Sequence, residues 1–153
     1  MPGWTRLALA YIIAVLVGGI LTTILSTQVV LQYLVNAGAA MPFDVRWTAT
    51  RTDLAGFAPT LILLTAIGYL IAFPVAAFIA RRIGGLRAFG YAAAGYVTIM
   101  VMIHAIEVFY QAMLASTITP IGSGRDLWGL LIIGFGGAIG GLVFAGLSPV
   151  RAR

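Results

Sequence analysis

Long apolar runs separated by short polar segments dominate the hydrophobic pattern of this chain. A helix needs about 20 apolar residues to cross the hydrocarbon core of a bilayer. Four runs are long enough, at about residues 7–34, 57–80, 88–115 and 127–147. The pattern therefore predicts an all-α membrane protein, with residues 1–153 forming a single transmembrane domain. We expect its four transmembrane helices to pack as an antiparallel bundle.

The connection between the first two runs is longer than the others. It reads "VNAGAAMPFDVRWTATRTDLAG" and contains Pro42, a residue that can begin a helix because its φ angle is fixed in the helical range. One interpretation is a short helix from Pro42 to about residue 52 that lies in the membrane interface between spans 1 and 2. An irregular loop fits the same residues.

Composition supports the membrane class and narrows the chemistry. The chain is 61% hydrophobic and only 8% charged, whereas soluble domains are about half apolar and about a quarter charged. It has no cysteine, which excludes disulfides, cysteine-bound metals and thiol catalysis. The basic residues are all arginines scattered between apolar runs rather than gathered in one patch, so we expect no nucleic-acid partner.

The distribution of the arginines predicts the orientation. One side of the predicted bundle carries Arg6, Arg81, Arg82, Arg87, Arg151 and Arg153. The other side carries Arg46, Arg51 and Arg125, beside Asp44, Asp53 and Asp126. Because positive residues without acidic neighbours favour the cytoplasmic side, we expect both termini in the cytoplasm of a bacterium, with the protein in the inner (plasma) membrane.

Small residues at four-residue spacing mark candidate helix contacts. Lipid is as apolar as leucine, so helices in a membrane associate through close packing of small side chains. The fourth run pairs Gly136 with Gly140 and Gly137 with Gly141, and the first run contains Gly18 and Gly19. These stripes either pack the chain's own bundle or face another subunit. With so little interior in four spans, we expect a homo-oligomer or a larger membrane complex.

The third run contains two ionisable residues, His104 and Glu107, three positions apart. Residues three and four apart share a helix face, so a polar stripe of this span would comprise His104, Glu107, Tyr110 and Gln111. His104 is expected near or slightly beyond the bilayer midplane. Gln28 and Gln32 of the first span are expected at a comparable depth, within reach of the external arginines. We interpret these groups as a half-depth polar cavity that opens to the external side.

A structural role for the ionisable pair is the simplest alternative. His104 and Glu107 would then satisfy each other and fix the helix register. Ionisable residues inside a membrane are, however, functional candidates by default. One His-x-x-Glu motif offers too few ligands for a di-iron site. Haem held by paired His104 residues of two subunits, or a nucleophile such as Ser26 or Thr27, has little else to support it. We expect no metal and no cofactor. The pattern leaves enzymatic activity open and favours a non-enzymatic role.

Two functional classes fit this pattern. The first is a binding or accessory module for a lipid, a hydrophobic ligand or a partner membrane protein. The alternative is an oligomeric small transporter or channel in which Glu107 and His104 respond to protons or cations. A pore should be polar along its whole length, whereas the cytoplasmic halves of spans two, three and four are almost wholly apolar. The pattern therefore favours the binding module.

Overall fold

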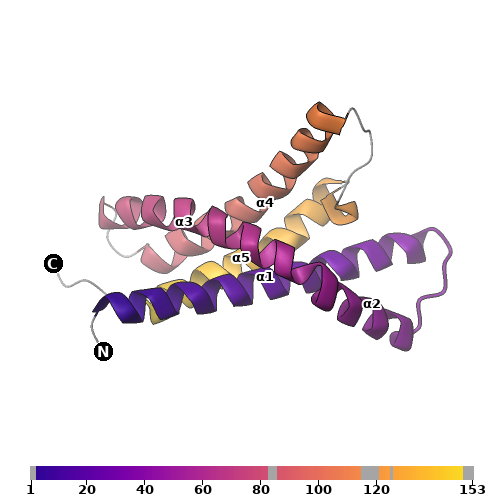
Figure 1. Cartoon of the computed structure of the whole chain (residues 1–153), viewed down its shortest axis with the longest axis horizontal. Helices are drawn as coiled ribbons and strands as arrows, with labels where there is room; N and C mark the ends of the chain where they lie inside the picture. Colours follow the sequence, from indigo (N-terminus) through magenta and orange to yellow (C-terminus); the bar gives the residue numbers. More distant parts are fainter. Residues whose placement is uncertain (1–2, 83–85, 115–120, 125, 150–153) are drawn as a thin grey trace.

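Helices account for nearly all of the chain that the structure describes. The structure is a computed structural model that describes residues 3–82, 86–114, 121–124 and 126–149. Its elements are α1 (Gly3–Asn36), α2 (Phe43–Gly56), α3 (Ala58–Arg82), α4 (Arg87–Leu114), the short 3-10 helix η1 (Gly122–Gly124) and α5 (Leu127–Leu147) (Figure 1).

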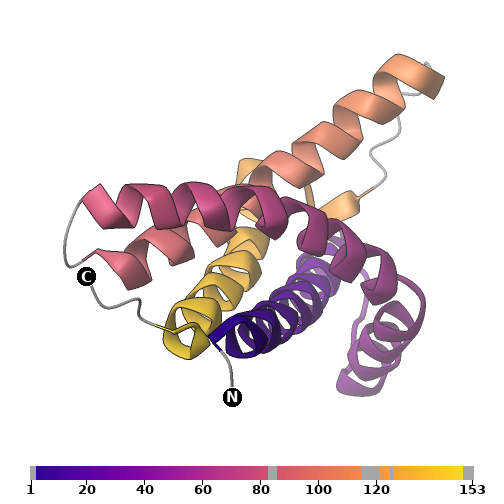
Figure 2. The ribbon, with the colours of Figure 1, turned by 60° about the vertical axis from the view of Figure 1, so that its left-hand side comes forward.

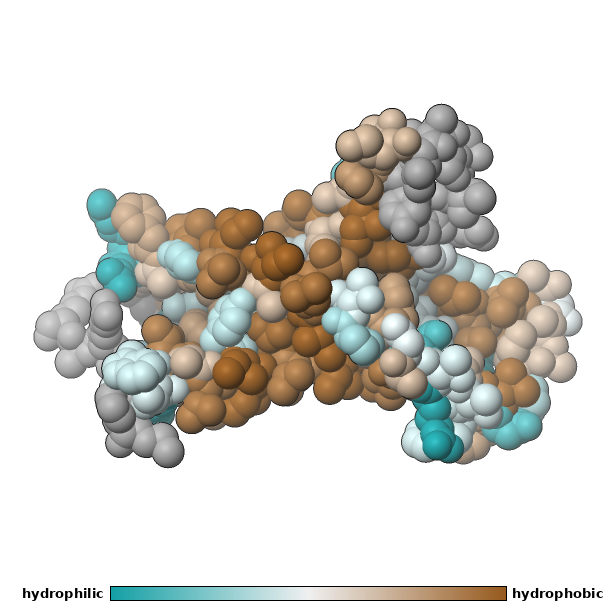
Figure 3. All heavy atoms as spheres, in the orientation of Figure 1, coloured by the Kyte–Doolittle hydropathy of each residue, from teal (hydrophilic) through white to brown (hydrophobic). Residues whose placement is uncertain are grey.

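The four predicted spans are confirmed as helices that are long and apolar enough to cross a membrane. They are α1, α3, the part of α4 from Arg87 to Phe109, and α5. The molecular surface agrees with this assignment, because Figure 3 shows a broad apolar band with hydrophilic residues gathered toward its two ends. The connection after α1 forms a helix rather than an irregular loop. Pro42 immediately precedes α2 with a φ of −64°, which suits a helix start.

α5 lies between α1 and α4 and makes most of the interhelical contacts (Figure 2). Glycines on two faces of α5 allow this close approach. On one face, a Cβ atom at Gly136 would lie 2.5 Å from the hydroxyl oxygen of Thr22 in α1. On the other face, a Cβ atom at Gly137 would lie 2.2 Å from the backbone oxygen of Gly95 in α4. The stripes of α5 therefore pack the chain's own bundle, and the alternative that they face another subunit is wrong for these residues.

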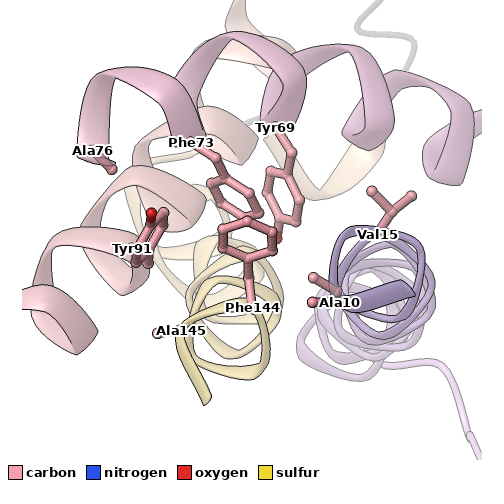
Figure 4. Close-up of a cluster of buried hydrophobic side chains, with 9 residues drawn as sticks. Ala10, Val15, Tyr69, Phe73, Ala76, Tyr91, Phe144 and Ala145 are labelled. Carbon is pink, nitrogen blue, oxygen red and sulfur yellow. The ribbon is translucent and has the colours of Figure 1, made fainter. Parts of the chain in front are cut away.

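Stacked aromatic rings fill the half of the bundle that carries Arg6, Arg81, Arg82 and Arg87, which we call the arginine end. Phe73 of α3 lies at the centre, with its ring centroid 4.3 Å from that of Tyr69 and 4.5 Å from that of Phe144 (Figure 4). Tyr91 of α4 packs edge-on against Phe144 at 5.0 Å. Because aromatic pairs at these distances add to the energy of burial, this cluster joins α3, α4 and α5 firmly.

The hydroxyl group of Tyr69 enters a socket formed by glycines. It donates a hydrogen bond of 2.7 Å to the backbone oxygen of Gly137. Cβ atoms at Gly18 and Gly140 would lie 2.5 Å and 2.3 Å from the same hydroxyl oxygen, so only glycine leaves room for it. Two other tyrosines also donate to backbone oxygens of neighbouring helices, Tyr11 to Ala66 and Tyr96 to Leu131. These bonds satisfy hydroxyl groups that would be costly in hydrocarbon.

Two arginines of the arginine end bind the last residue of α5 and the C-cap residue that follows it. Arg6 donates from Nε to the backbone oxygen of Leu147 at 3.1 Å, and Arg87 donates from Nη2 to that of Ser148 at 2.9 Å. Positive side chains stabilise the carbonyl groups that a helix leaves unpaired at its C-terminus. Both arginines therefore help to fix the bundle as well as contributing to the predicted topology signal.

The opposite half of the bundle is built differently. We call it the acidic end, because it carries Asp44, Asp53, Glu107 and Asp126. Its core contains aliphatic side chains from α1, α4 and α5, among them Val29, Ile103 and Ile133. The C-terminal part of α4 lies apart from α1 and α2 in both ribbon views (Figures 1 and 2).

Asp126 organises the start of α5. Its carboxylate accepts a hydrogen bond of 2.7 Å from the backbone nitrogen of Gly129 and a second from the hydroxyl group of Tyr33 in α1. These two bonds favour the ionised carboxylate and lower the pKa of Asp126 from its ordinary value. The aspartate thus caps α5 and joins it to α1.

Candidate functional site

Gln28 and Gln32 of α1 lie beside α2, where both bind Arg46. The guanidinium group donates from Nη1 to Oε1 of Gln28 at 3.1 Å and from Nη2 to Oε1 of Gln32 at 3.4 Å. The amide nitrogen of Gln28 donates to Oγ1 of Thr50 at 2.9 Å. We call these four residues the Arg46 cluster. It places three of the predicted site residues in one hydrogen-bonded group.

Hydroxyl side chains of α1 extend these polar contacts toward the bundle interior. Oγ1 of Thr27 lies 2.7 Å from a carboxylate oxygen of Asp53, and the hydroxyl oxygens of Ser26 and Ser123 lie 2.7 Å apart. One turn deeper, the hydroxyl group of Thr22 is fully buried and has no hydrogen-bond partner among the described residues. This face of α1 therefore holds α2 and η1 through hydrogen bonds.

His104 and Glu107 lie away from the Arg46 cluster. Nδ1 of His104 is 3.9 Å from Oε2 of Glu107, and their side chains are 71% and 27% exposed. No hydrogen bond or ion pair joins either residue to α1 or α2 in the described part of the chain. The structure thus brings Gln28, Gln32 and Arg46 together and leaves His104 and Glu107 apart from them, because α5 separates α4 from α1.

The position of the ionisable pair along α4 follows from counting residues. α4 begins at Arg87, and at a rise of 1.5 Å per residue His104 lies about 26 Å and Glu107 about 30 Å along the helix. Both groups therefore lie in the C-terminal part of α4, toward the acidic end. Because they share α4, the contact between them does not connect two helices.

The remaining predicted site residues make no contact, in the described part of the chain, with the Arg46 cluster or with the pair of His104 and Glu107. Arg51 is exposed on α2. The side chains of Tyr110 and Gln111, and all of Arg125, lie outside the described residues. Among the residues that the structure describes, no cluster of histidine, aspartate and glutamate could hold a metal ion.

A groove of about 820 Å³ runs between α3 and α4 on the outside of the bundle. We call it the α3–α4 groove; its lining comes from residues 64–80 and 86–105. Its volume falls within the range of about 300–1,000 Å³ that is typical of ligand sites. A bilayer-facing groove of this size can accommodate a hydrocarbon chain.

Small residues at four-residue spacing create the groove. Gly68, Ala72 and Ala76 follow one another along α3, opposite Gly90 and Ala94 of α4. A Cβ atom at Gly68 would lie 2.3 Å from Cγ2 of Thr98, so the two helices approach closely at the floor. The same spacing in the sequence could have indicated this groove.

The lining of the groove is suited to hydrocarbon alone. Among its described lining residues Thr98 is the one polar residue, and the threonine hydroxyl group already donates to the backbone oxygen of Ala94 at 2.7 Å. Exposed Ile71 and Val75 form one wall, and exposed Val97 and Val101 form the other. A bound molecule would be held by apolar contact rather than by hydrogen bonds.

Comparisons with protein-family models, with curated proteins and with solved structures find no match for this chain.

Proposed function

We propose that this protein is a multi-pass membrane module that binds the hydrocarbon chain of a lipid or another hydrophobic ligand in the α3–α4 groove. The observation that carries this proposal is the groove itself, with a volume of about 820 Å³ and an almost wholly apolar lining. It replaces the polar cavity around His104 and Glu107 as the site of binding. The Arg46 cluster then serves to fix α2 against α1.

The proposed cellular setting follows from the charge distribution. We place the protein in the inner membrane of a bacterium. Within that membrane we place both termini in the cytoplasm, because Arg6, Arg81, Arg82 and Arg87 gather at the arginine end without acidic neighbours among the described residues. An antiparallel bundle is supported by the contacts between α4 and α5. There Gly95 meets Gly137, and Tyr91, one turn earlier in α4, meets Gly141, one turn later in α5.

A homo-oligomer, or a subunit role in a larger membrane complex, remains part of the proposal. The four glycines of α5 are engaged within the chain, so a second subunit would need another surface. The exposed side of α4 around His104 offers one, since it presents an ionisable pair that lipid solvates poorly.

The transporter or channel alternative has weaker support. A polar path would require hydroxyl groups in the interior that are free to bind water or an ion. Thr22 and Thr65 fit this requirement, because both are fully buried and have no hydrogen-bond partner among the described residues. Toward the arginine end, however, the stacked rings of Tyr69, Phe73 and Phe144 occupy the interior. A path along α1 would be blocked there.

Filling the groove tests the proposed function. Ala72 and Ala93 line the groove, so Ala72→Phe and Ala93→Phe should occupy its space with a ring. Native mass spectrometry of protein extracted with its lipids should then show a loss of bound lipid or other hydrophobic ligand. Ala8→Phe, at an exposed position of α1 outside the groove, is the matched control and should retain the bound molecule. Equal retention by all three variants would contradict the proposal.

A further inference from the structure

The α3–α4 groove ends beside arginines. On α3 its lining ends at Ile79 and Ala80, immediately before Arg81 and Arg82. The segment across the groove begins at Leu86. A hydrocarbon chain lying in the groove would therefore bring its polar head group to the arginine end.

The four arginines that the structure describes at this end divide into two pairs. Arg6 and Arg87 donate hydrogen bonds to the backbone at the end of α5. Arg81 and Arg82 are both exposed, and no carboxylate among the described residues lies within ion-pair distance of either one. The four acidic residues of the chain all belong to the acidic end. Among the described residues, these two positive charges have no negative partner where the groove ends.

Helix geometry distinguishes Arg82 from Arg81. Arg82 follows Ile79 by three residues and Phe78 by four, so it shares their side of α3. Ile79 lines the groove. The guanidinium carbon of Arg82 lies 5.3 Å from the centre of the Phe78 ring. This contact holds the positive charge against the lipid-facing surface. Arg81 is rotated by about 100° from Arg82 around the helix axis.

We propose that the α3–α4 groove binds an anionic phospholipid, with an acyl chain along the groove and its phosphate group on Arg82. This inference rests on the proposed function and adds the class of ligand. The planar guanidinium group can donate two parallel hydrogen bonds to phosphate oxygens. Lipid phosphates lie at the level where an arginine at a helix end meets the membrane interface.

The test uses the full chain in nanodiscs that contain equal amounts of phosphatidylglycerol and phosphatidylcholine with identical acyl chains. After release, native mass spectrometry reports the ratio of the two lipids bound to the protein. We expect the wild-type protein to retain phosphatidylglycerol about fivefold over phosphatidylcholine, the factor that corresponds to one arginine near the membrane surface. Arg82→Gln should remove most of this preference, and Arg81→Gln, the matched control, should keep it.

Other results would overturn the inference in distinguishable ways. Equal binding of both lipids by the wild-type protein, combined with loss of both in Ala93→Phe, would refute the anionic ligand and leave the groove as a lipid site. Equal loss of preference in Arg81→Gln and Arg82→Gln would refute the assignment to Arg82. Lipid binding that Ala93→Phe leaves unchanged would refute the inference and the proposed function together.

Discussion

The arginine end and the acidic end of the bundle are held together by different interactions. At the arginine end, glycines bring helix backbones into contact and stacked rings fill the space beside them. At the acidic end, side-chain hydrogen bonds join α1 to α2, η1 and α5, while α4 lies apart from α1 and α2. Both ends contain packed residues and hydrogen bonds, but backbone contacts at glycines and stacked rings dominate at the arginine end. At the acidic end, many of the links between helices are side-chain hydrogen bonds that water or lipid head groups can replace.

This difference predicts unequal stability along the bundle. Close packing of small residues is the main source of helix association in a membrane, whereas a hydrogen bond between helices there contributes only about 0.6 kcal/mol on average. Regions with few buried contacts and exposed hydrogen bonds open first. We therefore expect the acidic end to open before the arginine end, which would leave the floor of the α3–α4 groove intact.

The largest effect is expected from a bulky side chain between α4 and α5. A Cβ atom at Gly141 would lie 2.0 Å from the backbone oxygen of Tyr91, so Gly141→Leu must push the two helices apart. We expect a loss of about 3 kcal/mol or more in the free energy of unfolding, measured by denaturant titration in detergent micelles. Gly146→Leu is the control, because no heavy atom lies within 4 Å of a Cβ atom there. Equal stability of the two variants would contradict the role of the glycine contacts.

A smaller effect is expected from the Arg46 cluster. Arg46→Ala removes two hydrogen bonds from a charged donor to α1. Because the arginine is only half-buried, we expect a loss of about 1 kcal/mol. Hydrogen exchange of the α2 amides should rise about fivefold, with the amides of α5 unchanged. Arg51→Ala, at an exposed position of the same helix, should have little effect. A matching rise in α5 would mean that the two ends are not independent.

The smallest expected effect is a pH dependence at the start of α5. The folded state lowers the pKa of Asp126 below its usual value of about 4. The carboxylate therefore stabilises the fold above that pH, and this contribution is lost as the pH falls through the lower pKa of the folded state. Unfolding measured in detergent should show a decrease in stability as the pH falls below about 4, and this decrease should be reduced in Asp126→Asn. Asp44→Asn should retain the full decrease, and the same curve for both variants would refute the assignment.

Hydropathy was sufficient to predict the four spans from the sequence. A run of about 20 apolar residues has few stable structures other than a helix across a bilayer, and Pro42 correctly marked the start of α2. The glycine pairs were also recognised as contacts, although the sequence left open whether the partner was the same chain. The structure identifies that partner because Gly95 and Thr22 approach α5 from opposite sides.

The candidate site could be predicted only in part. Depth along a helix follows from counting residues, but the order of helices around the bundle does not. His104 was grouped with Gln28 because both lay toward the same side of the membrane, whereas α5 separates their helices. The glutamines bind Arg46, one of the external arginines expected within their reach, whereas His104 lies apart from it. The roles of Tyr69 and Arg87 as donors to backbone oxygens also depend on which neighbour lies beside them.

The central position of α5 has a consequence for the biosynthesis of the protein. Membrane helices generally enter the bilayer in chain order, and α5 is the last of the four spans to be made. Until it arrives, α1 and α4 lack the helix that provides most of their contacts, and the hydroxyl group of Tyr69 lacks its acceptor at Gly137. The first three spans must therefore persist in the bilayer as a loose intermediate. Assembly of the bundle core then follows insertion, and it is complete only when α5 has packed between α1 and α4.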